Sequence, residues 1–210
     1  MKTTSMWQPA LLGGVLVLAS ASANAAVVYE ASYSGPDSLP FFASTLRYGD
    51  EITLGGTDRV LTEFSFGYYS NYAATGGLSF TLYANDGAAG APGTVLFTSN
   101  YNVVQGTDGV DISIPFIPDF NEPLPNTFTW TVQFSGPGTA GLLIADAPTI
   151  GTSRDDFWEL QGATWVLRKL SAPYTSNFEA TVTAVPEPGT WALLGLGLAV
   201  FGWSRWGRTR

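Results

Sequence analysis

The sequence contains no cysteine and no histidine. Their absence excludes disulfide bonds, thiol nucleophiles, Ser-His-Asp triads and zinc sites built from these residues. Charged residues make up only 12% of the 210 positions, and acidic residues outnumber basic ones by 17 to 9. Because phosphate binding requires clustered lysine and arginine, this balance predicts that the protein has no nucleic-acid partner.

Long apolar runs occur only at the two ends of the chain. Near the N-terminus, Lys2 precedes an apolar run over residues 10–19, and small residues then lead to Ala23-Asn24-Ala25. A positive start, a short apolar run and an A-x-A site are the parts of a secretory signal peptide. We predict cleavage by signal peptidase after Ala25, which leaves Ala26 as the first residue. An uncleaved anchor is the alternative, although the run is shorter than the roughly 20 residues that span a bilayer.

The C-terminal end combines three features in order. Val185-Pro186-Glu187-Pro188 comes first, an apolar run follows over residues 190–203, and the chain closes with Arg205, Arg208 and Arg210. The two prolines prevent the preceding strand from continuing and keep this peptide extended. The apolar run predicts a membrane-inserted helix of marginal length, with the three arginines on the cytoplasmic side.

This tail resembles the PEP-CTERM sorting signal of Gram-negative bacteria, and the resemblance covers residues 185–210. It implies that an exosortase, an integral membrane transpeptidase-like enzyme, recognises Pro186, Glu187 and Pro188 while the C-terminal helix is transiently inserted. It also implies export to the cell envelope, cell surface or extracellular matrix of a bacterium that makes exopolysaccharide. A plain single-pass anchor after a chance Pro-Glu-Pro is the alternative.

Residues 26–184 show apolar residues at every second position, which is typical of half-buried strands. The clearest case is Phe128–Phe134, and residues 64–68, 78–83, 110–114 and 178–183 repeat the pattern. Glycine-rich turns separate these segments. The pattern predicts an all-β fold, an antiparallel β-sandwich that is Greek-key or jelly-roll-like. We therefore divide the chain into a signal peptide (1–25), a β-sandwich domain (26–184) and a sorting signal (185–210).

The stretch from Tyr83 to Leu96 is similar to a loop of many exported PEP-CTERM β domains, which implies a scaffold role. Its Asn85, Asp86 and Gly87 suit a tight turn, because asparagine and aspartate cap their own backbone and glycine accepts a positive φ. Aspartate oxygens are also calcium ligands, but no Asp-x-Asp-x-Asp run is present. The sequence therefore favours a structural turn.

Two functional alternatives depend on one stretch near the end of the domain. A glycoside hydrolase needs only two carboxylates, and Asp155, Asp156 and Glu159 flank Phe157 and Trp158. These acidic residues fall in what reads as a polar loop, where solvated carboxylates are common. The predicted domain is also small, wholly β and free of histidine, so the hydrolase is the less favoured alternative.

A carbohydrate-binding module is the stronger alternative, because exposed aromatic rings bind sugars. Trp158 and Trp165 lie in the less regular stretch 151–169, which leaves room for exposed rings, and Tyr68, Tyr69 and Tyr72 form a second candidate patch. Core packing is the favoured explanation for every one of these rings, because sandwiches need bulky interior residues. Trp130 shares the phase of its apolar neighbours and is assigned to the core.

The leading prediction is a non-enzymatic, secreted protein of the cell envelope or extracellular matrix, structural or adhesive in an exopolysaccharide or biofilm setting. We predict no catalytic residue, no cofactor and no metal site. The predicted partners are signal peptidase, an exosortase and exopolysaccharide.

Overall fold

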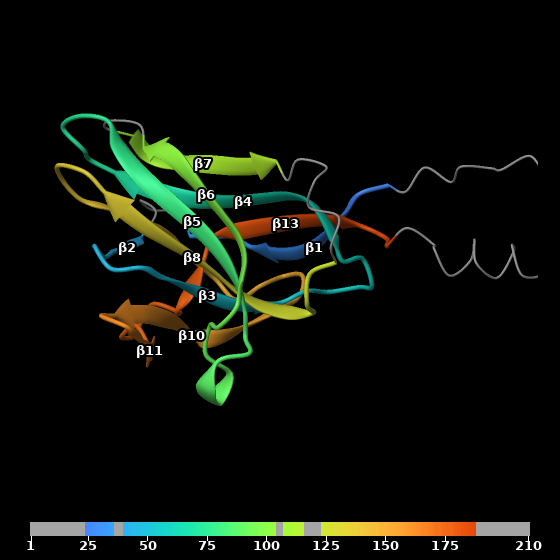
Figure 1. Cartoon of the computed structure of the whole chain (residues 1–210). Helices are drawn as coiled ribbons and strands as arrows, with labels where there is room; N and C mark the ends of the chain where they lie inside the picture. The colour runs from blue at the N-terminus through green and yellow to red at the C-terminus, as the bar shows by residue number, and fades with distance from the viewer. Residues whose placement is uncertain (1–23, 36–39, 104–106, 116–122, 188–210) are drawn as a thin grey trace, which may run out of the picture.

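The computed structural model describes residues 24–35, 40–103, 107–115 and 123–187 (Figure 1). All strand pairs within these residues are antiparallel, and they form two sheets. The predicted signal peptide and C-terminal helix lie outside the described residues. No helix in the described part of the chain has the length and apolarity needed to cross a membrane.

The first sheet, sheet A, contains both ends of the described chain. Its central strand β4 pairs with β13, β9 and β7, while β1 pairs with β13 at one edge. Strands β2 and β12 both pair with β9. The strands of sheet A are β1 (Ala26–Ala31), β2 (Phe41–Ala43), β4 (Val60–Ser70), β7 (Thr107–Pro115), β9 (Ala140–Ala145), β12 (Asn177–Phe178) and β13 (Ala180–Val185).

The second sheet, sheet B, has the strand order β11-β10-β3-β8-β5-β6. Its strands are β3 (Tyr48–Thr53), β5 (Gly76–Ala84), β6 (Val95–Val103), β8 (Thr127–Ser135), β10 (Thr152–Gln161) and β11 (Thr164–Arg168). A single 3-10 turn, η1 (Ala88–Gly90), lies in the β5–β6 connection.

Aromatic side chains fill the space between the two sheets. Phe64 of β4 lies 5.1 Å from Phe80 of β5 and 5.3 Å from Trp130 of β8, measured between ring centroids. Phe66 stacks on Phe80 at 5.7 Å. Trp130 is fully buried, so its predicted place in the core is confirmed. These contacts join the inner faces of the two sheets. The described residues are thus all-β and antiparallel, as predicted, and their arrangement is consistent with a sandwich.

The molecule has two distinct ends. Strand β4 begins beside the last residue of β13, with Val60 opposite Val185, and finishes with Ser70 opposite Ala140. The chain therefore enters and leaves the fold at one end, called here the terminal end. The β4–β5 and β8–β9 connections lie at the opposite end, called here the loop end (Figure 1).

Candidate functional site

The two predicted processing points meet at one corner of sheet A. Strand β1 pairs with β13, and the outermost pair joins Ala26 to Ala184. The predicted mature N-terminus is therefore also the first residue of β1. The predicted sorting peptide begins at the last residue of β13, so both peptides attach to the terminal end on neighbouring strands.

Strand β13 ends where the sorting peptide becomes exposed. Ala180, Val182 and Ala184 point inward and are buried, whereas Val185 is half-buried. Pro186 and Glu187 are exposed. Because proline has no N–H to donate to a neighbouring strand, the hydrogen-bonded ladder cannot continue through Pro186.

On the N-terminal side, Ala25 and Ala26 are exposed, and burial begins only at Val28. The remaining predicted processing residues, Ala23, Pro188 and the arginines 205, 208 and 210, lie outside the described residues. Both described ends of the processing segments are thus open to solvent at the same corner.

The C-terminal side of this corner matches a known protein-sorting motif. The family model for the PEP-CTERM protein-sorting motif matches residues 184–205. The chain is a PEP-CTERM motif-containing protein. The motif indicates an exported, envelope-associated protein and implies processing by an exosortase, a membrane enzyme. The match begins at Ala184, inside β13, so the motif starts without a linker between it and the sheet. No curated protein and no solved structure matches the chain.

The carboxylates weighed for a hydrolase lie in strand β10, so the expected polar loop is wrong. A bulge in the pairing of β10 with β3 between Ser153 and Phe157 displaces the acidic residues from regular alternation. Asp155 accepts a hydrogen bond from the Ser176 N–H at 2.8 Å and lies 2.5 Å from the Lys169 Nζ. These contacts lower the pKa of Asp155, with the Lys169 hydrogen bond as the larger cause. A general acid requires the opposite shift.

The other two carboxylates also have cationic neighbours. The Asp156 Oδ2 lies 3.8 Å from Arg154, and the Glu159 Oε2 lies 3.9 Å from Arg168. Glu159 is almost fully buried and accepts a hydrogen bond from Gln161 at 2.9 Å. These contacts hold Glu159 within the β10–β11 hairpin and place Asp156 beside Arg154 of the same strand.

The aromatic candidates divide into buried and half-buried rings. Trp158 is only 7% exposed, and its indole N–H donates to Glu51 at 3.3 Å, so the favoured explanation, packing, holds for this ring and the alternative of an exposed sugar platform is wrong. Trp165 is half-buried and meets Tyr83 edge-on, with 5.4 Å between centroids. Trp165 belongs to β11 and Tyr83 to β5, and strands β10, β3 and β8 lie between these two in sheet B. To make this contact, the β10–β11 hairpin must fold over the outer face of the sheet.

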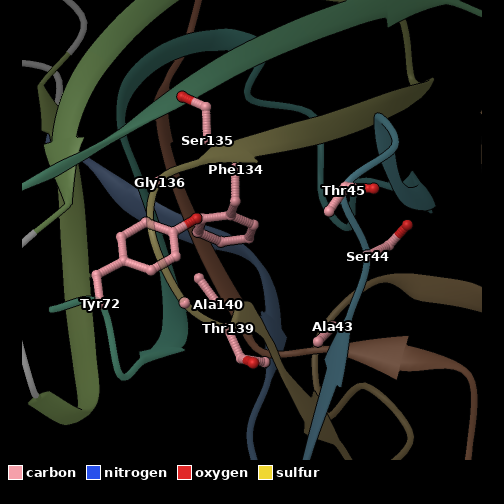
Figure 2. A pocket seen from close by; sticks show the side chains of 10 residues that line it. Ala43, Ser44, Thr45, Tyr72, Phe134, Ser135, Gly136, Thr139 and Ala140 are labelled. Carbon is pink, nitrogen blue, oxygen red and sulfur yellow. The ribbon is translucent and has the colours of Figure 1, made fainter.

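The proposed tyrosine patch does not form. Tyr68 is fully buried and Tyr72 is 3% exposed. Tyr69 is half-buried and stacks on Phe41, with 4.2 Å between ring centroids. Tyr72 instead lines a hollow of about 340 Å³ at the loop end, together with Ser44, Thr45 and Thr139. Figure 2 shows Tyr72 and the loop carrying Ser44 and Thr45 on different sides of this hollow.

The turn at Asn85-Asp86-Gly87 is structural. The Asp86 Oδ1 accepts a hydrogen bond from the Thr94 N–H, and the Asp86 Oδ2 accepts one from the Thr94 hydroxyl, both at 2.7 Å. Hydrogen bonding by the Thr94 side chain and backbone lowers the pKa of Asp86. Both carboxylate oxygens therefore help to close the β5–β6 connection.

The fold also buries the carboxylate of Asp50, which the sequence pattern does not predict. Asp50 of β3 is fully buried, and its Oδ1 accepts a hydrogen bond from the Ser153 hydroxyl at 2.7 Å. Its Oδ2, the Tyr29 hydroxyl and the Asp156 Oδ1 are all buried without a hydrogen-bond partner. Burial raises the pKa of Asp50, and the charge of Asp156 adds to this effect. The only sequence signal is the place of Asp50 between Tyr48 and Ile52, which share its face of the strand.

Proposed function

We propose that this chain is a non-enzymatic protein of the bacterial cell envelope or extracellular matrix, structural or adhesive in role. Signal peptidase releases its N-terminus after Ala25, and an exosortase processes the tail at the Pro186-Glu187-Pro188 peptide. The folded domain is the cargo of this route.

One observation carries the proposal. The matched sorting motif begins within β13, and the exposed Pro186 follows directly after the last paired residue of that strand. A membrane enzyme that reads this peptide therefore meets a folded domain immediately beside its substrate. The loop end is then directed away from the membrane.

The contacts of the acidic residues support a non-enzymatic role. Asp155 is held by Lys169 and by a backbone N–H, and Glu159 is buried against Gln161 and Arg168. The acid of a glycosidase has a raised pKa and faces the substrate together with its partner carboxylate, whereas the pKa of Asp155 is lowered and Glu159 is buried away from solvent.

Mass spectrometry of both ends of the mature protein tests the proposal. In a host with an active exosortase, we expect a chain that begins at Ala26 and lacks the apolar run and the arginines. In the same host without that enzyme, we expect the same N-terminus and the complete tail. A complete tail in both hosts would contradict processing by the exosortase.

A further inference from the structure

Two neighbouring hollows lie at the loop end of the molecule. The first, of about 340 Å³, is the hollow of Figure 2. The second, of about 460 Å³, lies across the ends of β6, β5 and β8 on the outer face of sheet B. Ser135 lines both, so they form one continuous surface, called here the loop-end surface. Each hollow has the size of a small-molecule site.

Uncharged polar groups dominate the second hollow. Ser79, Asn100, Asn102 and Gln133 contribute hydroxyl and amide groups to its lining. Asn100 and Asn102 are exposed, and their side chains make no hydrogen bond to any described residue. Amides both donate and accept hydrogen bonds, as sugar hydroxyls do, so these two side chains are available to a polyhydroxylated ligand.

The charge of the loop-end surface differs from that of the rest of the domain. Residues 26–184 contain 16 acidic and 5 basic side chains, a net charge of −11. No carboxylate is among the described residues that line either hollow. An anionic ligand would therefore meet less repulsion here than elsewhere on the domain.

Arg47 places a positive charge beside the second hollow. Its guanidinium donates to the hydroxyls of Ser79 at 3.0 Å and Thr81 at 2.6 Å. Among the described residues, it forms no ion pair with a carboxylate. A guanidinium has five N–H donors, so donors remain for a carboxylate ligand, which arginine binds strongly.

We propose that the loop-end surface binds an acidic polysaccharide, a polymer with sugar hydroxyls and carboxylates. In this complex, Asn100 and Asn102 bind sugar hydroxyls, and Arg47 binds a carboxylate. The proposal extends the proposed function, and rests on it for export: processing delivers the folded domain, which carries this surface at the end opposite its processed tail, into the envelope or matrix. Binding itself is a property of the folded domain and is measured separately from sorting.

The test uses processed protein purified from the producing host and two immobilised polymers, acidic polygalacturonate and neutral dextran. Asn100→Asp places a carboxylate in the hollow, and Arg47→Gln removes the adjacent positive charge. Arg59→Gln is the matched control, because it also lowers the net charge by one. Arg59 lies at the terminal end, beside Val60, where it donates to the Gly56 carbonyl at 2.9 Å.

We expect the wild type and Arg59→Gln to be retained on polygalacturonate and not on dextran. Retention should weaken as salt is added. Asn100→Asp and Arg47→Gln should each bind roughly tenfold more weakly, the effect of losing or opposing one charged hydrogen bond. Thermal unfolding of each variant establishes that it is folded. If Arg47→Gln fails to fold, Asn100→Asp decides, since the native Asn100 side chain makes no hydrogen bond to the described fold.

Three results would overturn the proposal: no retention of the wild type, equal retention on dextran, or equal retention of Asn100→Asp and the wild type. None of them depends on sorting. Tail processing of Asn100→Asp is followed in the same preparations, and it should match the wild type. A sorting failure leaves the complete tail on every variant, whereas a binding failure leaves the processing unchanged.

Discussion

Trp130 is the largest fully buried side chain among the residues whose burial is described, and it lies where the two sheets meet. Its ring contacts Phe64 and Phe66 of the opposite sheet, so truncation leaves a cavity at the centre of the sandwich. We expect Trp130→Ala to lower the free energy of unfolding by about 3–5 kcal/mol, measured by denaturant titration. Trp165→Ala, at a half-buried ring, is the control and should cost less. A loss below about 1 kcal/mol for Trp130→Ala would contradict its central place.

Asp50 is expected to destabilise the fold when it is ionised. Its carboxylate faces the Tyr29 hydroxyl of β1, Asp156 of β10 and the Phe178 N–H of β12, and it has no cationic partner among the described residues. Asp50→Asn removes the charge and supplies an N–H donor beside the unpaired oxygens. We expect the variant to be more stable than the wild type at pH 7 by about 1–3 kcal/mol, the cost of an unsatisfied buried polar group.

The raised pKa of Asp50 also predicts how the stability of the fold changes with pH. The folded-state pKa of Asp50 lies above its unfolded value of about 3.9, so between these two values the folded protein binds more protons. The contribution of Asp50 to stability is therefore complete below about pH 3.9 and is lost as the pH rises through the folded pKa. In unfolding curves recorded over a series of pH values, the free energy of unfolding of Asp50→Asn should not show this decline with rising pH. A wild-type stability that Asp50→Asn leaves unchanged at every pH would contradict the account.

Asp86→Asn is the control of opposite sign. The pKa of Asp86 is lowered by its bonds to Thr94, so its stabilisation is present above about pH 3.9 and is lost as the pH falls further. This variant should be less stable than the wild type at neutral pH.

These residues show what alternation can and cannot predict. The phase of Phe128, Val132 and Phe134 places Trp130 in the core correctly, because each neighbour is apolar and inward-facing. The same rule places an aspartate in solvent, yet Asp50 points inward with Tyr48 and Ile52. Its burial depends on Ser153 and Phe178, which are more than 100 positions away in the chain. No local pattern reports such partners.

At the scale of elements, strand β1 links export to folding. The predicted cleavage leaves β1 complete, from Ala26 to Ala31, and its outermost pair with β13 is then formed by the new N-terminal residue. Residues before Ala26 are not needed for this pairing. Cleavage at the predicted site would therefore leave every strand of the described sheet in place.

The cleavage site is tested by replacing Ala23 and Ala25 with leucine. Bulky residues do not fit the small-residue pattern that signal peptidase recognises, so we expect the variant to be targeted but not cleaved. N-terminal sequencing of the exported protein measures the outcome, with Ala26→Leu, one position after the site, as the control. Unchanged cleavage after residue 25 in the double variant would show that the site is elsewhere.

Strands with regular alternation were predicted well, whereas β3 and β10 were not. The sequence of β3, Tyr-Gly-Asp-Glu-Ile-Thr, includes a glycine and two acidic residues, which are depleted in strands. In β10 the bulge between Ser153 and Phe157 disrupts the period of two. Strand β3 pairs only with the distant strands β8 and β10, and β10 pairs with the distant β3 as well as with its hairpin partner β11, so local composition alone misleads. The loop-end surface is not predictable from local patterns for the same reason, because segments distant in the chain assemble it.

At the scale of the whole molecule, both predicted processing segments attach at the terminal end of the described domain, and the loop-end surface lies at the other end. The antiparallel pairing of β13 with β4 produces this arrangement, since β4 begins at Val60, opposite Val185, and ends at Ser70 at the loop end. A tail that holds the terminal end at a membrane leaves the hollows facing outward. The sorting motif itself was predictable from sequence because its parts are contiguous, whereas the orientation of the domain required the fold.

The central claim is that the peptide after β13 is read by a sorting enzyme, and its most direct test replaces Pro186-Glu187-Pro188 with three alanines. In a host with an active exosortase, we compare the tail length and membrane fractionation of the wild type and the variant. We expect the wild type to lose its tail, and the variant to remain in the inner membrane at full length. Its apolar run and arginines are unchanged, so a plain anchor would tolerate the substitution. Identical tail length and fractionation for the two proteins would contradict the account.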